Sequence, residues 1–143
     1  MSYLVDTNVL SEPGQKRANA KVLTWLEAHE PELYTSVLVT GEIRYGIERL
    51  SGAGARRAAL MDWYKKMLDL MAGRVLSINI RVAEEWAKLQ AEMQAKGVVL
   101  PIVDSLLAAT ARRYQLILVT DNVGDFERAG IRIFNPFEQD ERS

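Results

Sequence analysis

The sequence predicts an α/β protein in which helices cover both faces of a central parallel β-sheet, a three-layer sandwich. Short apolar strands alternate with amphipathic helices along the chain, as in parallel sheets. Two strands, Leu4-Val5 and Leu116–Val119, are apolar at successive residues, as strands buried on both faces are. The chain has 143 residues and shows no linker or internal repeat, so we expect a single domain over residues 1–143.

The first half of the chain predicts two strands and two helices. A buried strand is expected over Met1–Asp6, a helix over Asn19–His29 and a second strand over Glu32–Thr35. Ser36 can cap the next helix, Val37–Leu50, because its hydroxyl is suited to accept a hydrogen bond from an unpaired backbone N–H. Apolar residues recur at helical spacing along that helix.

The middle of the chain predicts two long helices separated by a short strand. A turn over Ser51–Gly54 leads into a helix over Arg56–Met71, whose apolar residues wrap most of its circumference. A strand follows over Val75–Ile78. The helix over Asn79–Lys96 is more clearly amphipathic, and Gly97 suits its C-terminus.

The last third predicts the remaining elements of the sandwich. A helix rich in small residues is expected over Ile102–Tyr114 and a strand over Leu116–Thr120. One helical turn over Asp125–Arg128 and a last strand over Ile131–Phe134 complete the domain.

Composition excludes several kinds of site. The chain has no cysteine, which excludes disulfides, thiolate nucleophiles and thiolate metal sites. Its single histidine, His29, excludes zinc sites built from several histidines, and we expect a surface or helix-terminal role for it. No apolar stretch reaches the ~20 residues of a membrane span, and we see no signal peptide. We therefore expect a cytoplasmic protein that does not contact membranes.

The formal net charge of −1 bears on the choice of partner. Proteins that bind nucleic acids without specificity usually carry an excess of basic residues. If this protein acts on a nucleic acid, its basic side chains must gather on one face, or a partner must supply part of the positive field.

Polar side chains follow two of the predicted strands directly. The first strand runs into Asp6-Thr7-Asn8, and the fourth runs into Thr120-Asp121-Asn122, with Asp125 three residues farther on. Ligands bind at the carboxyl ends of the strands in open parallel sheets. If the two strands are neighbours, these side chains lie side by side.

Two helices also carry acids among apolar residues, Glu42 and Asp104. An acid in such surroundings must either turn to solvent or find a partner. Ala108 and Ala111 share a helix face with Asp104, so that helix can pack close to the sheet and point Asp104 at the strand ends.

Several carboxylates in one pocket repel one another, and some would take up protons unless a cation neutralised them. Oxygen ligands without nearby histidine or cysteine suit Mg²⁺ or Mn²⁺ rather than zinc. Such an ion can acidify a bound water and stabilise charge on a phosphodiester, and a second ion can lie ~3.5–4 Å away.

Each acid also has a purely structural interpretation. Asp6 can cap a turn after its strand, and Asp104 can favour the dipole in the first turn of its helix. Glu42 can be a solvated helix residue, and Asp125 can cap a helical turn.

Taken together, four stretches of the sequence resemble the PIN domain family, most of all the VapC/FitB-type toxins of prokaryotic toxin–antitoxin pairs. The closing Asn135-Pro136-Phe137 is similar to that subgroup as well. The resemblance covers essentially the whole chain and is specific in the order and spacing of its motifs. The four stretches are Asp6-Thr7-Asn8-Val9-Leu10, Thr40-Gly41-Glu42-Ile43-Arg44-Tyr45-Gly46, Pro101-Ile102-Val103-Asp104 with Ala108-Ala109-Thr110-Ala111, and Val119-Thr120-Asp121-Asn122 with Asp125-Phe126.

The resemblance implies a PIN-like α/β sandwich and an RNA endonuclease that depends on Mg²⁺ or Mn²⁺. It implies a homodimer and a small antitoxin that neutralises the toxin. Asp6, Glu42 and Asp104 match the family's acidic metal-site positions. The neighbouring polar groups that would orient these acids are Thr7, Asn8, Ser105 and Thr120.

The fourth acid departs from the family pattern. Many members have aspartate where this chain has Asn122, which Asp121 and Asp125 flank. We favour Asp125 as the acid that completes the site, with Asn122 contributing a neutral oxygen.

The resemblance also suggests surfaces for RNA and for partners. The apolar stripe over Leu60–Met71 is wider than one buried face, so part of it is a candidate dimer or antitoxin surface. Six basic residues are candidates for contact with RNA phosphates or for pairing with a partner. They are Arg44, Arg49, Arg56, Arg57, Lys65 and Lys66.

The expected function is that of a toxin endoribonuclease in which a metal-activated water hydrolyses the RNA phosphodiester. The alternative is a binding subunit of an autorepressing toxin–antitoxin complex, with weak or no nuclease activity, that meets DNA only through its antitoxin. A phosphohydrolase of the haloacid-dehalogenase type would need a second aspartate at position 8, and that residue is Asn8.

Overall fold

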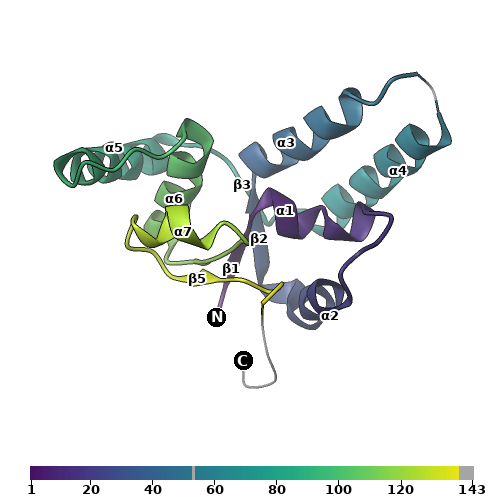
Figure 1. Ribbon diagram of the computed structural model, residues 1–143, viewed down its shortest axis with the longest axis horizontal. Helices are drawn as coiled ribbons and strands as arrows, with labels where there is room; N and C mark the ends of the chain where they lie inside the picture. Colours follow the sequence, from purple (N-terminus) through teal and green to yellow (C-terminus); the bar gives the residue numbers. More distant parts are fainter. Residues whose placement is uncertain (53, 139–143) are drawn as a thin grey trace.

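Five parallel strands form the central sheet, in the order β3-β2-β1-β4-β5. The computed structural model describes residues 1–52 and 54–138. Figure 1 shows the strands in the middle of the molecule, with helices on either side. The strands are β1 (Tyr3–Val5), β2 (Leu33–Ser36), β3 (Val75–Leu76), β4 (Ile117–Val119) and β5 (Ile133–Phe134).

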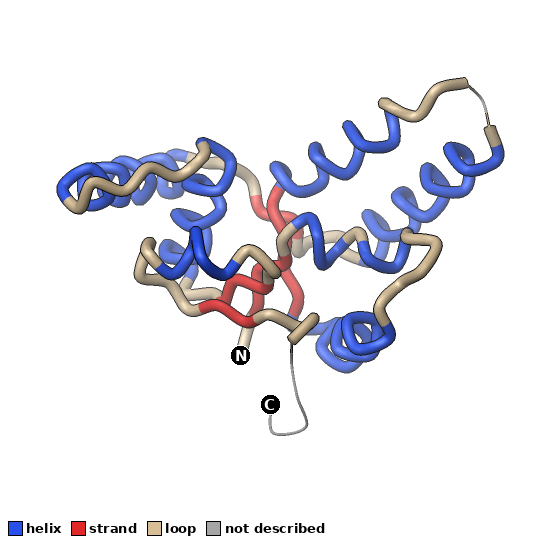
Figure 2. The backbone as a smooth tube through the Cα atoms, in the orientation of Figure 1, coloured by secondary structure: helices blue, strands red, loops and turns tan. Residues whose placement is uncertain are grey.

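The helices form the two outer layers, which confirms the predicted three-layer sandwich (Figures 1 and 2). The helices of the first half of the chain lie on one side of the sheet, and those of the second half lie on the other. The first group is α1 (Thr7–Leu10), α2 (Ala20–His29), α3 (Val37–Glu48) and α4 (Ala55–Leu70). The second is α5 (Ile80–Ala95), α6 (Ile102–Tyr114) and α7 (Val123–Glu127).

Side chains at the helix N-termini explain where several helices begin. Ser36 Oγ accepts a hydrogen bond from the backbone N–H of Leu38 at 3.1 Å, which caps α3 as predicted. Asn79 Oδ1 accepts one from the N–H of Val82 at 3.0 Å and caps α5. The turn predicted over Ser51–Gly54 includes residue 53, which lies outside the described residues.

The main departure from prediction is α1, a helix of four residues that begins directly after β1, together with the 3-10 turn η1 (Glu12–Gly14). One helical turn is too short for apolar residues to recur at helical spacing, so the sequence pattern carries no signal for it. A second 3-10 turn, η2 (Glu30–Glu32), links α2 to β2.

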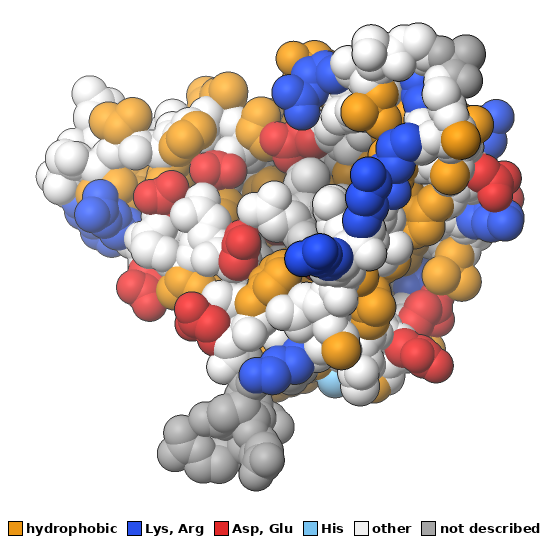
Figure 3. All heavy atoms as spheres, turned by 45° about the vertical axis from the view of Figure 1, so that its right-hand side comes forward, with side chains coloured by type: hydrophobic (Ala, Val, Ile, Leu, Met, Phe, Trp, Pro, Cys, Tyr) orange, Lys and Arg blue, Asp and Glu red, His pale blue; other side chains and the backbone are white. Residues whose placement is uncertain are grey.

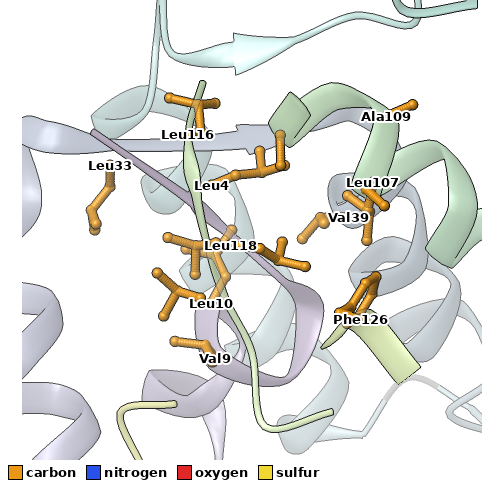
Figure 4. Packing of buried hydrophobic residues seen from close by; sticks show 14 of the residues in the cluster. Leu4, Val9, Leu10, Leu33, Val39, Leu107, Ala109, Leu116, Leu118 and Phe126 are labelled. Carbon is orange, nitrogen blue, oxygen red and sulfur yellow. The ribbon is translucent and has the colours of Figure 1, made fainter. Parts of the chain in front are cut away.

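The core lies around β1 and β4. Leu4, Val5, Leu118 and Val119 are completely buried, as expected for strands covered on both faces. Figure 4 shows apolar side chains from both helical layers gathered around these strands. Ala108 and Ala109 of α6 are also completely buried, so their small side chains let α6 pack close to the sheet.

Strand order places the carboxyl ends of β1 and β4 next to each other. Val5 pairs with Val119 in parallel register, and the backbone N–H of Asp6 donates to the carbonyl of Val119 at 2.9 Å. The chain leaves β1 for β2 on one side, whereas β4 lies on the other, so this is the topological switch point of the sheet. The prediction that the polar residues after these two strands lie side by side is confirmed.

Within the described residues, none of the helices combines the length and apolar character needed to cross a bilayer.

Candidate active site

Asp6 lies at the carboxyl end of β1, and only 8% of it is exposed to solvent. One carboxylate oxygen, Oδ1, accepts a hydrogen bond from the backbone N–H of Thr7 at 2.7 Å and thereby caps α1. The other, Oδ2, accepts one from the hydroxyl of Thr120 at 2.8 Å. Two elements therefore fix the orientation of this carboxylate, and the structural role as a cap is real.

Burial raises the pKa of Asp6 above its ordinary value, because the charged form loses hydration. The hydrogen bonds from Thr120 and Thr7 act in the opposite direction, and the charges of Glu42 and Asp121 raise the pKa further. Two hydrogen bonds thus stabilise the charged form of Asp6, but they do not offset the effects of burial and of the neighbouring acids.

Glu42 reaches the same place from α3. Its Oε1 accepts a hydrogen bond from the hydroxyl of Thr7 at 2.5 Å, and the residue is otherwise exposed. Thr7 therefore links the two acids, because its backbone N–H donates to Asp6 and its hydroxyl donates to Glu42.

Asp104 lies half-buried in the first turn of α6. Desolvation raises its pKa first, and the charges of Asp6, Asp125 and Glu42 raise it further. The acids on β1, α3, α6 and α7 therefore lie close enough to repel one another, although they are far apart in the sequence.

Two asparagines hold the acids that follow β4. Asn8 Nδ2 donates to Asp121 Oδ1 at 2.8 Å, and Asn122 Nδ2 donates to Asp125 Oδ2 at 3.2 Å. The charge of Asp121 raises the pKa of Asp6, whereas the charge of Asp125 raises the pKa of Asp104. We call Asp6, Glu42, Asp104, Asp121 and Asp125 the acidic cluster.

Ser105 was expected to orient one of the acids, but its described hydrogen bonds are to other residues. Its hydroxyl donates to the carbonyl of Ile102 at 2.7 Å and accepts from Trp86 Nε1 at 2.8 Å. It therefore joins α6 to α5. We expected Ser105 near the acids because it follows Asp104 in the sequence. Successive residues of a helix point about 100° apart, however, so the two side chains lie on different faces of α6.

The donor set of the acidic cluster fits a hard divalent cation, because every available donor is a carboxylate, amide or hydroxyl oxygen. In residues 1–52 and 54–138, however, no three of the acids are already close enough together to hold an ion.

Basic residues beside the cluster escaped the sequence analysis. A hollow of about 610 Å³ adjoins Asn8 and Asp121, and its lining includes Lys16 and Arg17, as well as the expected Arg56. Lys16 and Arg17 follow the unpredicted α1 and η1. Their closeness in sequence to Asp6 is the signal that could have identified them.

Comparison with known proteins gives consistent matches. The model of the PIN domain family matches residues 3–131. The plasmid stability protein StbB of Pseudomonas syringae pv. tomato is 37% identical, over 94% of this chain and 98% of the relative. VapC ribonuclease Y4jK of Sinorhizobium fredii is 34% identical, over 94% of this chain and 97% of the relative. The crystal structure of FitAcB from Neisseria gonorrhoeae superposes with a TM-score of 0.89 and 31% identity, over 96% of this chain and 99% of that one.

Proposed function

The chain belongs to the PIN domain family, and we propose that it is the toxin of a toxin–antitoxin pair, an endoribonuclease that uses Mg²⁺ or Mn²⁺. Relatives that align over most of their length support this proposal by name, among them the VapC ribonuclease of Sinorhizobium fredii and toxin FitB of Neisseria gonorrhoeae.

The observation that carries the proposal is the gathering of acids from four elements at the switch point of the sheet, where Thr7 hydrogen-bonds to both Asp6 and Glu42. Asp6 and Asp104 both have raised pKa values, and each feels the charges of other members of the cluster. Evolution of a stable fold alone gives no reason to gather uncompensated carboxylates there, whereas a cation site does.

A bound divalent ion would supply charge to stabilise the phosphodiester and would make a water more acidic. In the proposed site Asp6 and Asp104 would hold the ion, and Asp125 would complete the ring of acids. Glu42 would bind it directly or through water and would help to position the attacking water. Hydrolysis adds hydroxyl to phosphorus and a proton to the departing oxygen of the RNA chain.

Neighbouring side chains keep the acids in place for this chemistry. Thr120 holds one oxygen of Asp6, and Thr7 holds Glu42. Asn122 holds Asp125 and in turn donates its backbone N–H to Thr120 Oγ at 3.1 Å. We found no side chain placed as a covalent nucleophile in the described part of the site, so water fills that role.

We also propose a homodimer and a small cognate antitoxin as partners, with the protein acting on RNA in the cytoplasm. Solved structures similar to this chain include FitAcB and a FitAB complex bound to an IR36 DNA fragment. The stripe on α4 offers one surface for such a partner, since Leu70 is 60% exposed. It borders an apolar groove of about 470 Å³ that Leu23 and Leu26 of α2 also line.

The proposal is tested by RNA cleavage with Mg²⁺ or Mn²⁺, with EDTA, and with the variants Asp6→Asn and Asp104→Asn. We expect cleavage by the wild type only with the ion, and a loss of at least about 100-fold in each variant. Asp62→Asn is the matched control, because Asp62 is an exposed carboxylate on α4 that pairs with Lys66. Full activity in Asp6→Asn, or equal activity in EDTA, would reject the proposed site.

A second candidate function is a binding subunit of an autorepressing complex, which would contact DNA only through the antitoxin. It is favoured by the solved neighbours bound to DNA, such as FitAB on its IR36 fragment. It is also favoured by the absence, among the described residues, of three acids already converged on one point. Promoter binding by the complex without any RNA cleavage by the free chain would favour this candidate.

A further inference from the structure

A hollow of about 610 Å³ opens beside the acidic cluster. We call it the basic hollow, after the three cationic side chains in its lining, Lys16, Arg17 and Arg56. These come from two separate parts of the chain, the segment after η1 and the first turn of α4. The tertiary structure therefore brings together charges that are 39 or more positions apart in sequence, counted from Arg17 to Arg56.

The basic hollow is continuous with the proposed active site. Asn8 and Asp121, which hydrogen-bond to each other in the acidic cluster, also line the hollow. A second, smaller hollow of about 290 Å³ is lined by Thr7 and Glu42 and shares Arg56 with the first. A polymer that reaches the acids thus has open surface on which to continue.

The cations of the basic hollow are not neutralised within the described protein. Lys16, Arg17 and Arg56 are exposed, and none forms an ion pair with another described residue. Arg56 is oriented instead by a hydrogen bond from Nη2 to the carbonyl of Gly14 at 2.8 Å. The guanidinium keeps its remaining donors for an external anion.

Two of the other basic candidates from the sequence analysis are already paired. Arg44 and Arg57 both bind Glu48, on α3. On the face shown in Figure 3, Lys and Arg side chains form a band beside a group of Asp and Glu side chains. Glu12 and Asp121 also line the hollow, so its positive charge is an excess of cations over acids rather than a uniform patch.

An aromatic ring completes the lining. Phe137 is half-buried, and its backbone N–H donates to Asn135 Oδ1 at 2.9 Å, which fixes the turn that carries it. Cations for phosphates combined with an aromatic face for bases are the features by which proteins hold unpaired nucleic-acid strands.

We propose that the basic hollow is the track on which single-stranded RNA lies next to the scissile phosphodiester. Lys16, Arg17 and Arg56 contact phosphates, and the ring of Phe137 stacks on a base. This inference rests on the proposed function and adds to it the residues that position the substrate. It also answers the problem of a nuclease with a net charge of −1, because the cations gather where the strand passes.

The experiment is RNA binding measured by fluorescence anisotropy in EDTA, with a labelled single-stranded RNA and a series of salt concentrations. The test variant is Lys16→Gln/Arg17→Gln/Arg56→Gln. The control is Arg81→Gln/Lys88→Gln/Lys96→Gln, which removes the same charge from α5 and its C-cap, in the layer on the other side of the sheet. Without metal, the result does not depend on whether the chain cleaves RNA.

We expect the test variant to bind RNA at least about tenfold more weakly at 0.15 M salt. Its salt slope should fall by up to about 2, since each phosphate contact on a single strand contributes about 0.7. The α5 control should keep the wild-type affinity and slope. Equal losses in the test variant and the control would mean a diffuse charge effect and would overturn the track.

Cleavage kinetics separate this inference from the proposed function. With Mg²⁺ or Mn²⁺, the test variant should show a raised KM and a kcat near that of the wild type. A wild type that binds RNA through the hollow but never cleaves it would reject the proposed function and keep the track. A cleaving wild type whose KM and affinity survive the triple substitution would reject the track alone. Unchanged RNA affinity with weakened antitoxin binding would assign the hollow to the antitoxin and reject the track as well.

Phe137→Leu tests the stacking part separately, because leucine keeps the apolar contact and loses the aromatic face. We expect about tenfold weaker RNA binding with an unchanged salt slope. Wild-type affinity in this variant would remove Phe137 from the track.

Discussion

Asp6 combines a structural and a proposed chemical role at one residue. It caps α1 through the N–H of Thr7, and it receives the hydroxyl of Thr120 from the neighbouring strand. These hydrogen bonds favour its charged form, yet burial and the neighbouring acids raise its pKa overall. The charge of Asp6 therefore reduces the stability of the metal-free fold.

We predict that Asp6→Asn is more stable than the wild type at neutral pH in EDTA. Asparagine can still accept from the N–H of Thr7, and its amide can donate to Thr120 Oγ in place of the hydrogen bond that Thr120 now donates to Asp6. Both contacts can therefore be kept while the charge is lost. The gain would be seen as a higher Tm in thermal denaturation.

The pH dependence gives the sign of this effect. Because its pKa is raised in the folded state, Asp6 holds its proton to a higher pH than the unfolded chain does. The free energy of unfolding therefore falls as the pH rises from 3.8, the ordinary pKa of the group, to the raised pKa of Asp6 in the folded protein. The advantage of Asp6→Asn should thus vanish below pH 3.8 and be complete above the folded pKa. An Asn variant less stable than the wild type at neutral pH would contradict this account.

At the scale of elements, one arginine links three of them. Arg74, in the loop between α4 and β3, donates to the carbonyls of Leu33 and Leu70 at 3.0 and 2.8 Å. It also binds both the carbonyl and the carboxylate of Glu30. This side chain therefore ties the end of α4 to the turn before β2 by hydrogen bonds.

We predict that Arg74→Met lowers the free energy of unfolding by about 2 kcal/mol, because three carbonyls and a carboxylate lose the hydrogen bonds that the guanidinium donates. The control is Lys66→Met, which removes an exposed ion pair with Asp62 at 3.0 Å and should change stability by less than about 0.5 kcal/mol. Both are measured by urea denaturation. Similar values for the two variants would show that Arg74 is not a special link.

The largest difference between the elements predicted from sequence and those observed is due to the short helix α1. The long helices α5 and α6 repeat their apolar residues over several turns, and their predicted bounds agree closely with the structure. In contrast, α1 has one turn, and its start is decided by the side chain of Asp6. Its consequence is functional, since α1 carries Asn8 to Asp121 and leads into Lys16 and Arg17.

At the scale of the whole molecule, the fold holds acids from several elements close enough that their charges raise one another's pKa values. A cation that binds this cluster in the folded state alone would raise stability by mass action. At a free concentration of 100 times the dissociation constant, the gain is about 2.7 kcal/mol.

We therefore predict that Mg²⁺ or Mn²⁺ raises the Tm of the wild type in a concentration-dependent way and that EDTA reverses the shift. Asp104→Asn should show a much smaller rise, whereas Asp62→Asn should respond like the wild type. This measurement needs no RNA and reports on the ion site alone. The same shift in all three proteins would mean that the ions act elsewhere on the surface.

Much of this protein is determined by local sequence pattern. The alternation of strands and helices, the cap at Ser36, and the acids after β1 and β4 follow from residue types and their spacing. Such features depend on nearby residues, so a linear sequence is enough to predict them.

Strand order and packing decided the rest, because they set which distant residues meet. Only the tertiary structure shows that Asn8 binds Asp121, that the charge of Asp125 raises the pKa of Asp104, and that Ser105 binds Trp86. It also brings Arg56 to Lys16 and Arg17 in one hollow. These relations depend on helix rotation and on loops that cross the sheet, and a periodic pattern along the chain contains neither.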